Sequence, residues 1–494
     1  MEIRSTEPRL MGNGTKSLVT LMFCGTLLWM NACTVGPNYK RPTANVPSAY
    51  RAALAPEAAA SESTRAPATP VSSGGAGSVS LGEEKWWEVF EDPELQGLIR
   101  TALKNNYDVR IAATRVLEAQ AQLGITRADQ LPSLSAGGNV TSVRNPKVGP
   151  IPAYEITQGQ VSASASWNVD FWGRYRRATE AARAIVLANQ WAQKEVMATL
   201  VANVASSYFL LRQLDLELEI SRRTLGSRQD SLDLTKTLEE HGINSLLDVR
   251  QSEQLVYTAA AEIPDLERQI GQEENAISIL LGNNPGDITR GLKLTEQPHA
   301  PEVPVGLPSS LLERRPDIRA AEENLVAANA QIGVARAAYF PQISLTGTAG
   351  YESAALTNLF TGPAGIWTLV GSVTQPIFEG GRLKSNVRLA EAQREQLLLT
   401  YQQAIQGAFR DVSNALIAYR KFREFRIQQQ HLVESAQDAA RLSGVRFKAG
   451  TADYLEVLTN ETNSFSAELA LAQAQGNELN ALVELYQALG GGWD

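Results

Sequence analysis

The chain contains the same pattern of residues twice, and this internal repeat limits the folds that are open to it. Short features of the first half return in the second half, 208 or 209 positions later. The matched features are Asp108-Val109-Arg110 with Asp317-Ile318-Arg319, Leu131-Pro132 with Phe340-Pro341, Gly173-Arg174 with Gly381-Arg382, His241-Gly242 with Ala449-Gly450, and Leu281-Gly282 with Leu489-Gly490. A register held along the whole repeat predicts that the body of the protein is two copies of one structural unit.

Each copy begins with a helical stretch and continues with strands. The helical stretch runs from Glu94 to Gln130 or from Ser309 to Tyr339, and it ends before a proline, which cannot continue a helix. Beyond the proline, apolar and polar residues alternate, a period that is typical of a strand with one apolar face. We expect two strands per copy, joined by Pro- and Gly-rich loops at Asn145 to Gln158 and Ala354 to Gly365. The expected strands cover about 133–143, 160–171, 342–353 and 366–378.

The second expected strand shows the clearest alternation, because the residues from Val161 to Phe171 are apolar and polar in strict turn. A tilted strand of about this length crosses a bilayer. Aromatic residues also gather at both ends of the strands, where they suit the two interfaces of a membrane. One group is Phe171, Trp172, Phe340 and Phe378, and the other is Tyr154, Tyr351, Phe360 and Trp367. We therefore expect a membrane-spanning sheet; the alternative is a soluble sheet with one wetted face.

Four strands per chain are too few to form a closed barrel. A membrane does not tolerate an open sheet edge, because the unpaired backbone groups find no water to bond. The smallest closed barrels have about eight strands, so we expect the chain to assemble with copies of itself. Two copies would give an eight-stranded barrel filled by side chains, whereas three copies would give twelve strands and room for a pore.

A very long helical stretch follows the second strand of each copy, from Arg174 to Gly242 and from Arg382 to Gly450. At about 1.5 Å per residue, each helix is roughly 100 Å long. Apolar residues along the second of these stretches and along the last helix are spaced mainly by three and four, which is coiled-coil spacing. Gly173 and Gly381 mark turns from strand to helix, and Gly242 and Gly450 mark reversals at the far ends. Because the helices continue from lumen-lining strands, we expect a hollow wall rather than a solid bundle.

Residues 1–32 have the pattern of an export signal. Basic residues up to Lys16 precede an apolar run from Leu18 to Met30 that is too short for a permanent membrane helix. The residues before Cys33 resemble a bacterial lipoprotein cleavage site, so we expect a covalent lipid on Cys33 and no other cofactor. The alternative is an ordinary export signal in which Cys33 is incidental. Residues 33–93 then form a lipidated segment and a linker rich in Pro, Ala, Ser and Gly. We expect no transmembrane helix in the mature chain.

Composition argues against several classes of function. The 53 acidic residues outnumber the 45 basic residues, and the net charge of -8 disfavours a nucleic-acid partner bound through positive charge. His241, His299 and His431 lie far apart in the sequence, and neither a His-Glu-x-x-His nor a Gly-x-Ser-x-Gly motif occurs. We therefore expect neither a metal site nor an enzyme.

Several motifs resemble the signatures of the outer-membrane efflux lipoproteins, also called NodT-type outer membrane factors. The motifs are Leu312-Glu313-Arg314-Arg315-Pro316-Asp317-Ile318-Arg319-Ala320-Ala321-Glu322, Ala328-Asn329-Ala330-Gln331-Ile332-Gly333-Val334-Ala335-Arg336-Ala337, Val169-Asp170-Phe171-Trp172-Gly173-Arg174, Gln375-Pro376-Ile377-Phe378-Glu379-Gly380-Gly381-Arg382, Gly36-Pro37-Asn38-Tyr39 after Cys33, and the terminal Leu489-Gly490-Gly491-Gly492-Trp493. The resemblance covers the chain from Cys33 to the C-terminus.

The resemblance implies the exit duct of a tripartite resistance-nodulation-division efflux pump, lipid-anchored in the outer membrane. The implied fold class is an α+β membrane protein, a homotrimeric 12-stranded transmembrane β-barrel continued by a long α-helical periplasmic barrel. Repeat 1 would occupy residues 94–282 and repeat 2 residues 309–490, with an equatorial segment at 283–308 and a tail at 491–494. The implied partners are further copies of the chain, outer-membrane lipid, a periplasmic adaptor and an inner-membrane transporter. The alternatives are a protein-secretion channel and a structural envelope lipoprotein without conduction.

In that family, side chains just after the second-copy turn close the periplasmic tip of the duct. Leu455 keeps the apolar gate position here, whereas Thr459 and Thr462 stand where the family has an acidic and a basic residue. We hypothesise that charged residues beside the two turns act at the constriction instead, the alternative being solvated turns without a gating role. These residues are Asp248, Arg250, Asp453 and Glu456.

Overall fold

The computed structural model describes residues 34–44, 46–47, 50–51, 81, 84–298 and 308–493. The expected signal, the lipid site at Cys33, most of the linker, His299 and part of the equatorial segment lie outside the described residues. The chain divides into two compact units. The first contains Met1–Pro42, Leu117–Leu187 and Glu323–Leu399, and the second contains Thr43–Val116, Ala188–Glu322 and Thr400–Asp494.

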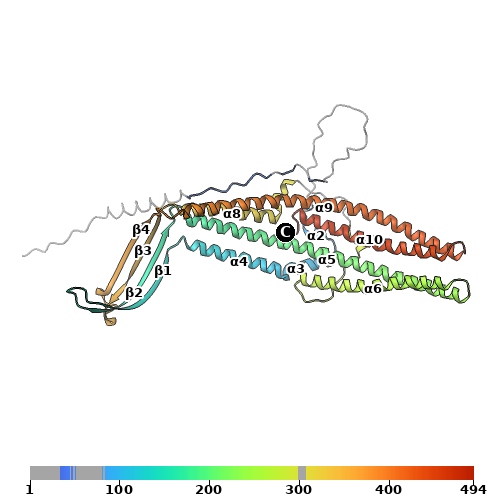
Figure 1. Ribbon diagram of the computed structural model, residues 1–494, viewed down its shortest axis with the longest axis horizontal. Helices are drawn as coiled ribbons and strands as arrows, with labels where there is room; N and C mark the ends of the chain where they lie inside the picture. The colour runs from blue at the N-terminus through green and yellow to red at the C-terminus, as the bar shows by residue number, and fades with distance from the viewer. Residues whose placement is uncertain are drawn as a thin grey trace, which may run out of the picture. The chain divides into compact units, whose positions relative to one another are not determined.

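The first unit contains one antiparallel sheet with the strand order β1-β2-β3-β4 (Figure 1). The strands are β1 (Ser133–Asn145), β2 (Tyr154–Val169), β3 (Gln342–Ser353) and β4 (Gly365–Thr374). Each copy of the sequence repeat therefore contributes one hairpin, and the two hairpins join through β2 and β3.

The register of the sheet places the alternating apolar residues on one common face. One apolar row crosses all four strands through Ala136, Ala163, Ala349 and Trp367. The neighbouring polar row runs through Ser135, Ser164, Thr348 and Thr368. The expected two faces are thus confirmed, and Val370 is an apolar exception on the polar side, where it pairs with Thr346.

Several strand ends differ from the expected ones: β1 runs on to Asn145, and β2 stops at Val169 rather than at residue 171. Residues 154–158 were expected in a loop, but they pair with the end of β1 and lengthen β2, so the hairpin loop shrinks to the residues around the Val148–Ile151 bridge. At the other edge, β4 stops at Thr374 rather than continuing to Phe378. Pro376 has no N–H to donate to a sheet, and Gln375 uses its side-chain amide to bond the carbonyl of Tyr339.

Helices make up the rest of the described chain. The shorter ones are α2 (Trp86–Val89), α3 (Pro93–Asn105), α7 (Leu311–Arg314), η3 (Leu294–Glu296), η4 (Pro308–Ser310), η5 (Leu356–Asn358) and η6 (Gly362–Ala364). The longer ones are α4 (Tyr107–Ala128), α5 (Arg174–Glu240), α6 (Leu246–Leu280), α8 (Pro316–Ala337), α9 (Arg382–Lys448) and α10 (Tyr454–Ala488). Helices α5 and α9 have 67 residues each, or roughly 100 Å, and both units draw on them.

The first helical stretch of each copy is interrupted, which the sequence analysis did not anticipate. Asn106 separates α3 from α4, because its carboxamide accepts the N–H of Asp108 and donates to the carbonyl of Leu280. In the second copy, Arg315 separates α7 from α8 with an extended backbone. A residue before a proline, here Pro316, avoids the helical conformation.

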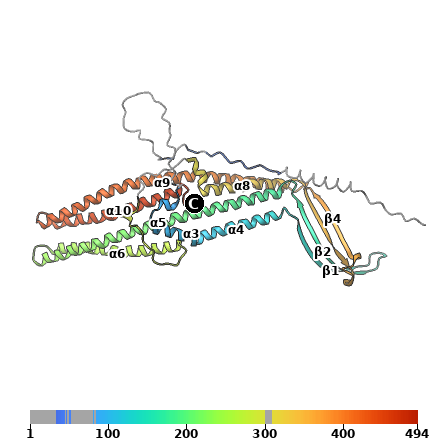
Figure 2. The same ribbon diagram turned by 180° about the vertical axis from the view of Figure 1, so that it is seen from behind.

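Two helical hairpins form the far part of the second unit, α5 with α6 and α9 with α10 (Figure 2). Gly242 and Gly450 lie at their turns with φ of 70° and 71°, and Gly173 and Gly381 precede α5 and α9 with φ of 78° and 89°. These left-handed conformations are easily adopted only by glycine. Among the described residues, no helix is both long enough and apolar enough to span a membrane.

The middle of the second unit is organised around Asp92, which is fully buried. Its carboxylate caps α3 and accepts hydrogen bonds from the Tyr208 hydroxyl at 2.8 Å, the Gln297 amide at 2.9 Å and the Leu292 N–H at 2.9 Å. Burial acts to raise the pKa of Asp92, but these hydrogen bonds outweigh it and hold the pKa below its usual value. The contacts fasten the segment between the repeats to α3 and α5.

Candidate channel wall and gate

The apolar face of the sheet carries large side chains that are almost fully exposed in one chain. Leu134 is 80% exposed, Trp367 79% and Leu369 74%. Isolated apolar residues on a surface are ordinary, but a continuous face of this size marks a contact with lipid or protein. The face follows every second residue of the sheet, as on the lipid side of a membrane strand.

The polar face is lined by hydroxyl groups that bond one another across the strands. The oxygen pairs are Ser133–Ser166 at 3.0 Å, Ser135–Ser164 at 2.9 Å and Ser344–Ser372 at 2.6 Å. Short neutral side chains of this kind are wetted without filling a lumen. The face is suited to line water.

The sheet is incomplete as it stands. Strands β1 and β4 each have a neighbour on one side only. Their outer edges therefore present rows of backbone N–H and C=O groups without partners in the sheet. In a membrane these groups require pairing with another strand.

The α5–α6 turn holds two of the hypothesised gate charges, and the structure gives both of them partners in their own helix. Asp248 lies in the first turn of α6, where its carboxylate accepts the N–H and the hydroxyl of Ser245, both at 2.9 Å. Arg250 is exposed and pairs with Glu253 at 2.6 Å. Asp248 thus completes a capping box with Ser245 at the start of α6, and Arg250 is exposed to solvent while paired with Glu253.

The α9–α10 turn holds the other gate candidates. Asp453 is the N-cap residue of α10 but makes no capping bond with its side chain. Leu455 is 61% exposed. Glu456 pairs with Arg446 across the turn at 2.5 Å. The side chains at the two substituted family positions bond their own helix, Thr459 to the carbonyl of Leu455 and Thr462 to that of Leu458.

One of the contacts that join the two hairpins, near their turns, involves residues that the sequence analysis missed. The hydroxyls of Ser252 on α6 and Tyr454 on α10 lie 2.5 Å apart, and both side chains are buried. Leu255 packs on the cluster of Tyr454, Val457 and Leu458 beside them. None of the four hypothesised charges pairs with another of the four in the described contacts.

The comparisons with known proteins agree with this geometry. Residues 98–283 and 307–491 match the family described as "Outer membrane efflux protein". The chain belongs to this family. It is 37% identical over 487 residues to the toluene efflux pump outer membrane protein TtgC of Pseudomonas putida, covering 97% of this chain and 96% of that one. It is 33% identical over 474 residues to the cation efflux system protein CusC of Escherichia coli, covering 96% and 98%.

Solved structures show the same fold. The open state of the MtrE outer membrane channel of Neisseria gonorrhoeae superposes with a TM-score of 0.81 at 32% identity, covering 94% of this chain and 99% of that one. A membrane protein from Pseudomonas aeruginosa gives a TM-score of 0.83 at 32% identity, covering 93% and 100%. This outer membrane efflux protein therefore places its sheet in the outer membrane and its helices in the periplasm, where it serves as an exit duct.

In the first unit of the efflux protein, the helices border an open hollow of 740 Å³. Amide and small side chains from α4, α5, α8 and α9 line it, among them Gln122, Ala181, Asn324 and Gln393. The amide groups can form hydrogen bonds with water, and the lining also includes the carboxylate of Asp129 and the apolar side chain of Ile185. In the part of the chain that the structure describes, no group of three His, Cys, Asp or Glu side chains is arranged to hold a metal ion.

An N-terminal strap, residues 34–38, is fastened to the first unit. The buried guanidinium of Arg177 donates to the carbonyl of Val35 at 3.3 Å and to the side chain of Asn38 at 2.7 Å, and Asn329 donates to the carbonyl of Pro37 at 2.9 Å. A Cβ on Gly36 would lie 2.5 Å from the Cα of Gly333, so the close approach of strap and α8 requires glycine.

Proposed function

We propose that three copies of the chain form a twelve-stranded barrel with a continuous helical tunnel. The open edges of the four-stranded sheet carry this proposal, because β1 of one copy can pair with β4 of the next until the ring closes. Three copies also explain the small hydroxyl-bearing lumen face, which an eight-stranded barrel of two copies would have to fill with larger side chains.

The trimer would act as the passive outer part of a tripartite pump, with no reaction catalysed. Its partners would be a periplasmic adaptor at the helical end and a proton-driven resistance-nodulation-division transporter in the inner membrane. Relatives named for toluene and for cations share at least a third of their aligned residues with this chain. That range supports a duct that passes whatever its transporter delivers.

The two helical turns would form the gate at the periplasmic end. Leu455 supplies an exposed apolar side chain, and Asp453 supplies a carboxylate that makes no capping bond at the start of α10. Arg250 and the Arg446–Glu456 pair add charge that can meet the same groups of neighbouring copies. Asp248 would contribute charge to the gate, and it also stabilises the start of α6 by accepting the N–H of Ser245. The Ser252–Tyr454 contact would hold the two hairpins of one copy together.

Planar-bilayer recording tests both the duct and its charged gate. The purified trimer is expected to give stepwise single-channel conductance and a trimer band on gels that is lost on heating. Replacing Asp248 with Asn and Glu456 with Gln together should change the single-channel conductance, because two carboxylates per copy leave the constriction. Arg268→Gln serves as the control, because that guanidinium pairs with Asp265 on the same helix, distant from the turn. An unaltered conductance in the double variant would argue against the charged gate.

We further propose that Cys33 carries the covalent lipid of a bacterial lipoprotein. The strap supports this, because Thr34 packs on Gly173 where α5 leaves the sheet, and Cys33 directly precedes Thr34. A lipid on that residue would enter the membrane beside the barrel. Mass spectrometry of the N-terminal peptide should find a chain that starts at Cys33 with diacylglycerol on its sulfur. In a Cys33→Ala variant the lipid should be absent, and an unmodified Cys33 in the native protein would refute the proposal.

A further inference from the structure

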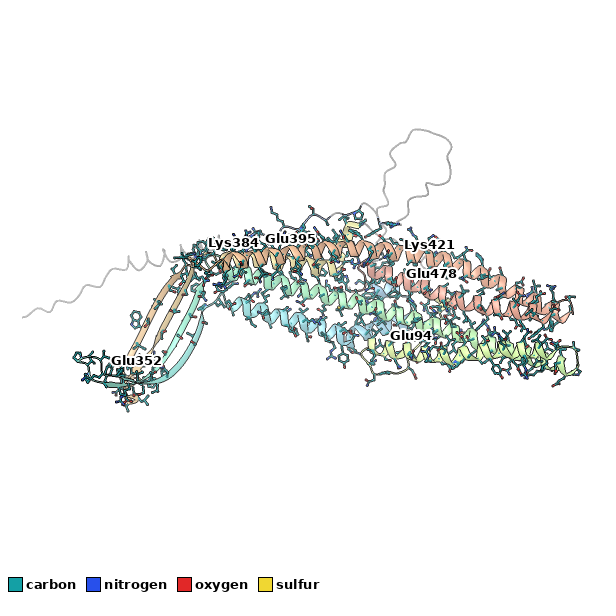
Figure 3. The ribbon with its side chains drawn as sticks, in the orientation of Figure 1. Glu94, Glu352, Lys384, Glu395, Lys421 and Glu478 are labelled. Atoms are coloured by element: carbon teal, nitrogen blue, oxygen red, sulfur yellow. The ribbon has the colours of Figure 1, made fainter. Side chains whose placement is uncertain are left out.

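Four exposed cations without a carboxylate partner among the described residues lie where the helices meet the sheet. Arg127 is in the last turn of α4, Arg174 is the first residue of α5, and Lys384 and Arg388 lie in the first two turns of α9. Figure 3 shows Lys384 at this end of the first unit and Glu352 at the opposite end of the strands. We call these four residues the basic collar.

Other charges of this region are already compensated. Arg176 pairs with Asp170, Arg382 with Glu379 and Arg336 with Glu391. Asp129, just after the end of α4, is an exposed carboxylate in this region. Its single negative charge is smaller than the four positive charges of the collar. The collar is therefore a local positive excess in a chain whose net charge is -8.

The positions of Arg174 and Lys384 are unfavourable for the helices themselves. The N-terminal end of a helix has a partial positive charge, which disfavours cations and favours acidic residues. Five other helices follow this preference, with Glu94 in α3, Asp108 in α4, Asp248 in α6, Asp317 in α8 and Glu456 in α10. Helices α5 and α9, the two that start at the sheet, have no acidic residue in the first turn. At the start of α5, the carboxylate of Asp170 accepts the N–H groups of Tyr175 and Arg176. At the start of α9, an anion from outside the protein would relieve the repulsion of Lys384.

The collar adjoins the apolar surface of the membrane sheet. Ile377 is 95% exposed and Phe378 88%, and both lie between β4 and the start of α9. Arg388 is six residues into α9, or about 9 Å along the helix, and its long side chain can reach back toward the sheet. The side chains of the collar can therefore reach the headgroup layer that borders the apolar face of the sheet. This layer is roughly 5–8 Å thick.

We propose that the basic collar binds the phosphate groups of anionic phospholipids in the inner leaflet of the outer membrane. Charge complementarity and continuity with the apolar face carry the assignment, which rests on the sheet being the membrane-spanning part. The bound headgroups fix the depth of the barrel in the membrane, since α5 and α9 cannot move inward without burying their cations. The depth of the barrel in the membrane is then set by the bound headgroups as well as by the sheet.

The experiment compares lipids that stay with the full-length trimer after mild extraction from mixed vesicles of phosphatidylglycerol and phosphatidylcholine. The unmodified protein should retain phosphatidylglycerol in excess over its share of the vesicle, and 1 M NaCl should reduce the excess. The collar variant is Arg174→Gln, Lys384→Gln and Arg388→Gln together. Each cation near an anionic surface changes lipid affinity by a factor of about five, so the enrichment should fall at least fivefold.

The matched control is Lys104→Gln, Arg115→Gln and Lys236→Gln, which removes the same charge from exposed sites of α3, α4 and α5 in the second unit. It should keep the enrichment. Equal retention of both lipids by the unmodified protein, or unchanged enrichment in the collar variant, would overturn the proposal. Failure of the unmodified protein to enter the mixed vesicles would instead overturn the membrane assignment of the sheet, and the collar with it. A trimer band in each variant shows that it is assembled.

Discussion

Replacing Tyr454 with Phe should make the duct open far more often. The change keeps the ring that packs on Phe447 at a centroid distance of 5.2 Å and removes the hydroxyl bonded to Ser252. One such bond contributes about 1 kcal/mol. If the three copies of a trimer open together, three distant bonds add to about 3 kcal/mol, or roughly a hundredfold in the ratio of open to closed channels. Open probability in planar bilayers measures the change directly.

The control for this experiment is Thr459→Val. Its hydroxyl bonds the carbonyl of Leu455 in the same helix and links no second hairpin, so the open probability should stay as in the unmodified protein. Ser252→Ala should reproduce the effect of Tyr454→Phe from the other side of the contact. If Tyr454→Phe and the unmodified protein open equally often, the Ser252–Tyr454 contact does not hold the gate.

The sheet was largely predictable because its signal is local. The two-residue period from Val161 to Phe171 predicts which side chains share a face. In the register of all four strands, residues of the same kind lie in common rows. The start of β2 was not predictable, because Tyr154 lies among prolines and glycines and becomes strand only by pairing with Asn145. At the start of β2, the hydrogen bonds to β1 outweigh the preference of the local sequence for a turn.

The two helical turns were predictable in position, but the contacts beside them were not. Gly242 and Gly450 mark the turns in the sequence, so the residues beside them could be named. Ser252 and Tyr454 are 202 positions apart and meet only through packing of α6 on α10. No spacing rule relates residues on separate helices. The capping role of Asp248, by contrast, had a local signal, since Ser245 three residues earlier forms the start of a capping pair.

Substitution of Leu369 by Lys should abolish assembly, whereas the same substitution at the adjacent Thr368 should preserve it. Leu369 lies in the middle of β4 on the apolar face and is 74% exposed in one chain. A lysine on the lipid side near the bilayer centre costs about 2–4 kcal/mol, and three copies multiply the cost to about 6–12 kcal/mol. The heat-sensitive trimer band and the outer-membrane fraction should both lose the Leu369→Lys protein.

Thr368 is the matched control because it points to the opposite face, in the row of Ser135, Ser164 and Thr348. A lysine there meets water in the lumen and adds three positive charges to the pore of a trimer. The Thr368→Lys trimer should therefore form and shift its ion selectivity toward anions, which the reversal potential in a salt gradient records. If both lysines are tolerated equally, neither face of the sheet meets lipid. If Thr368→Lys alone fails to assemble, the apolar and polar faces have been assigned the wrong way round, because the register leaves no third orientation for adjacent residues of one strand.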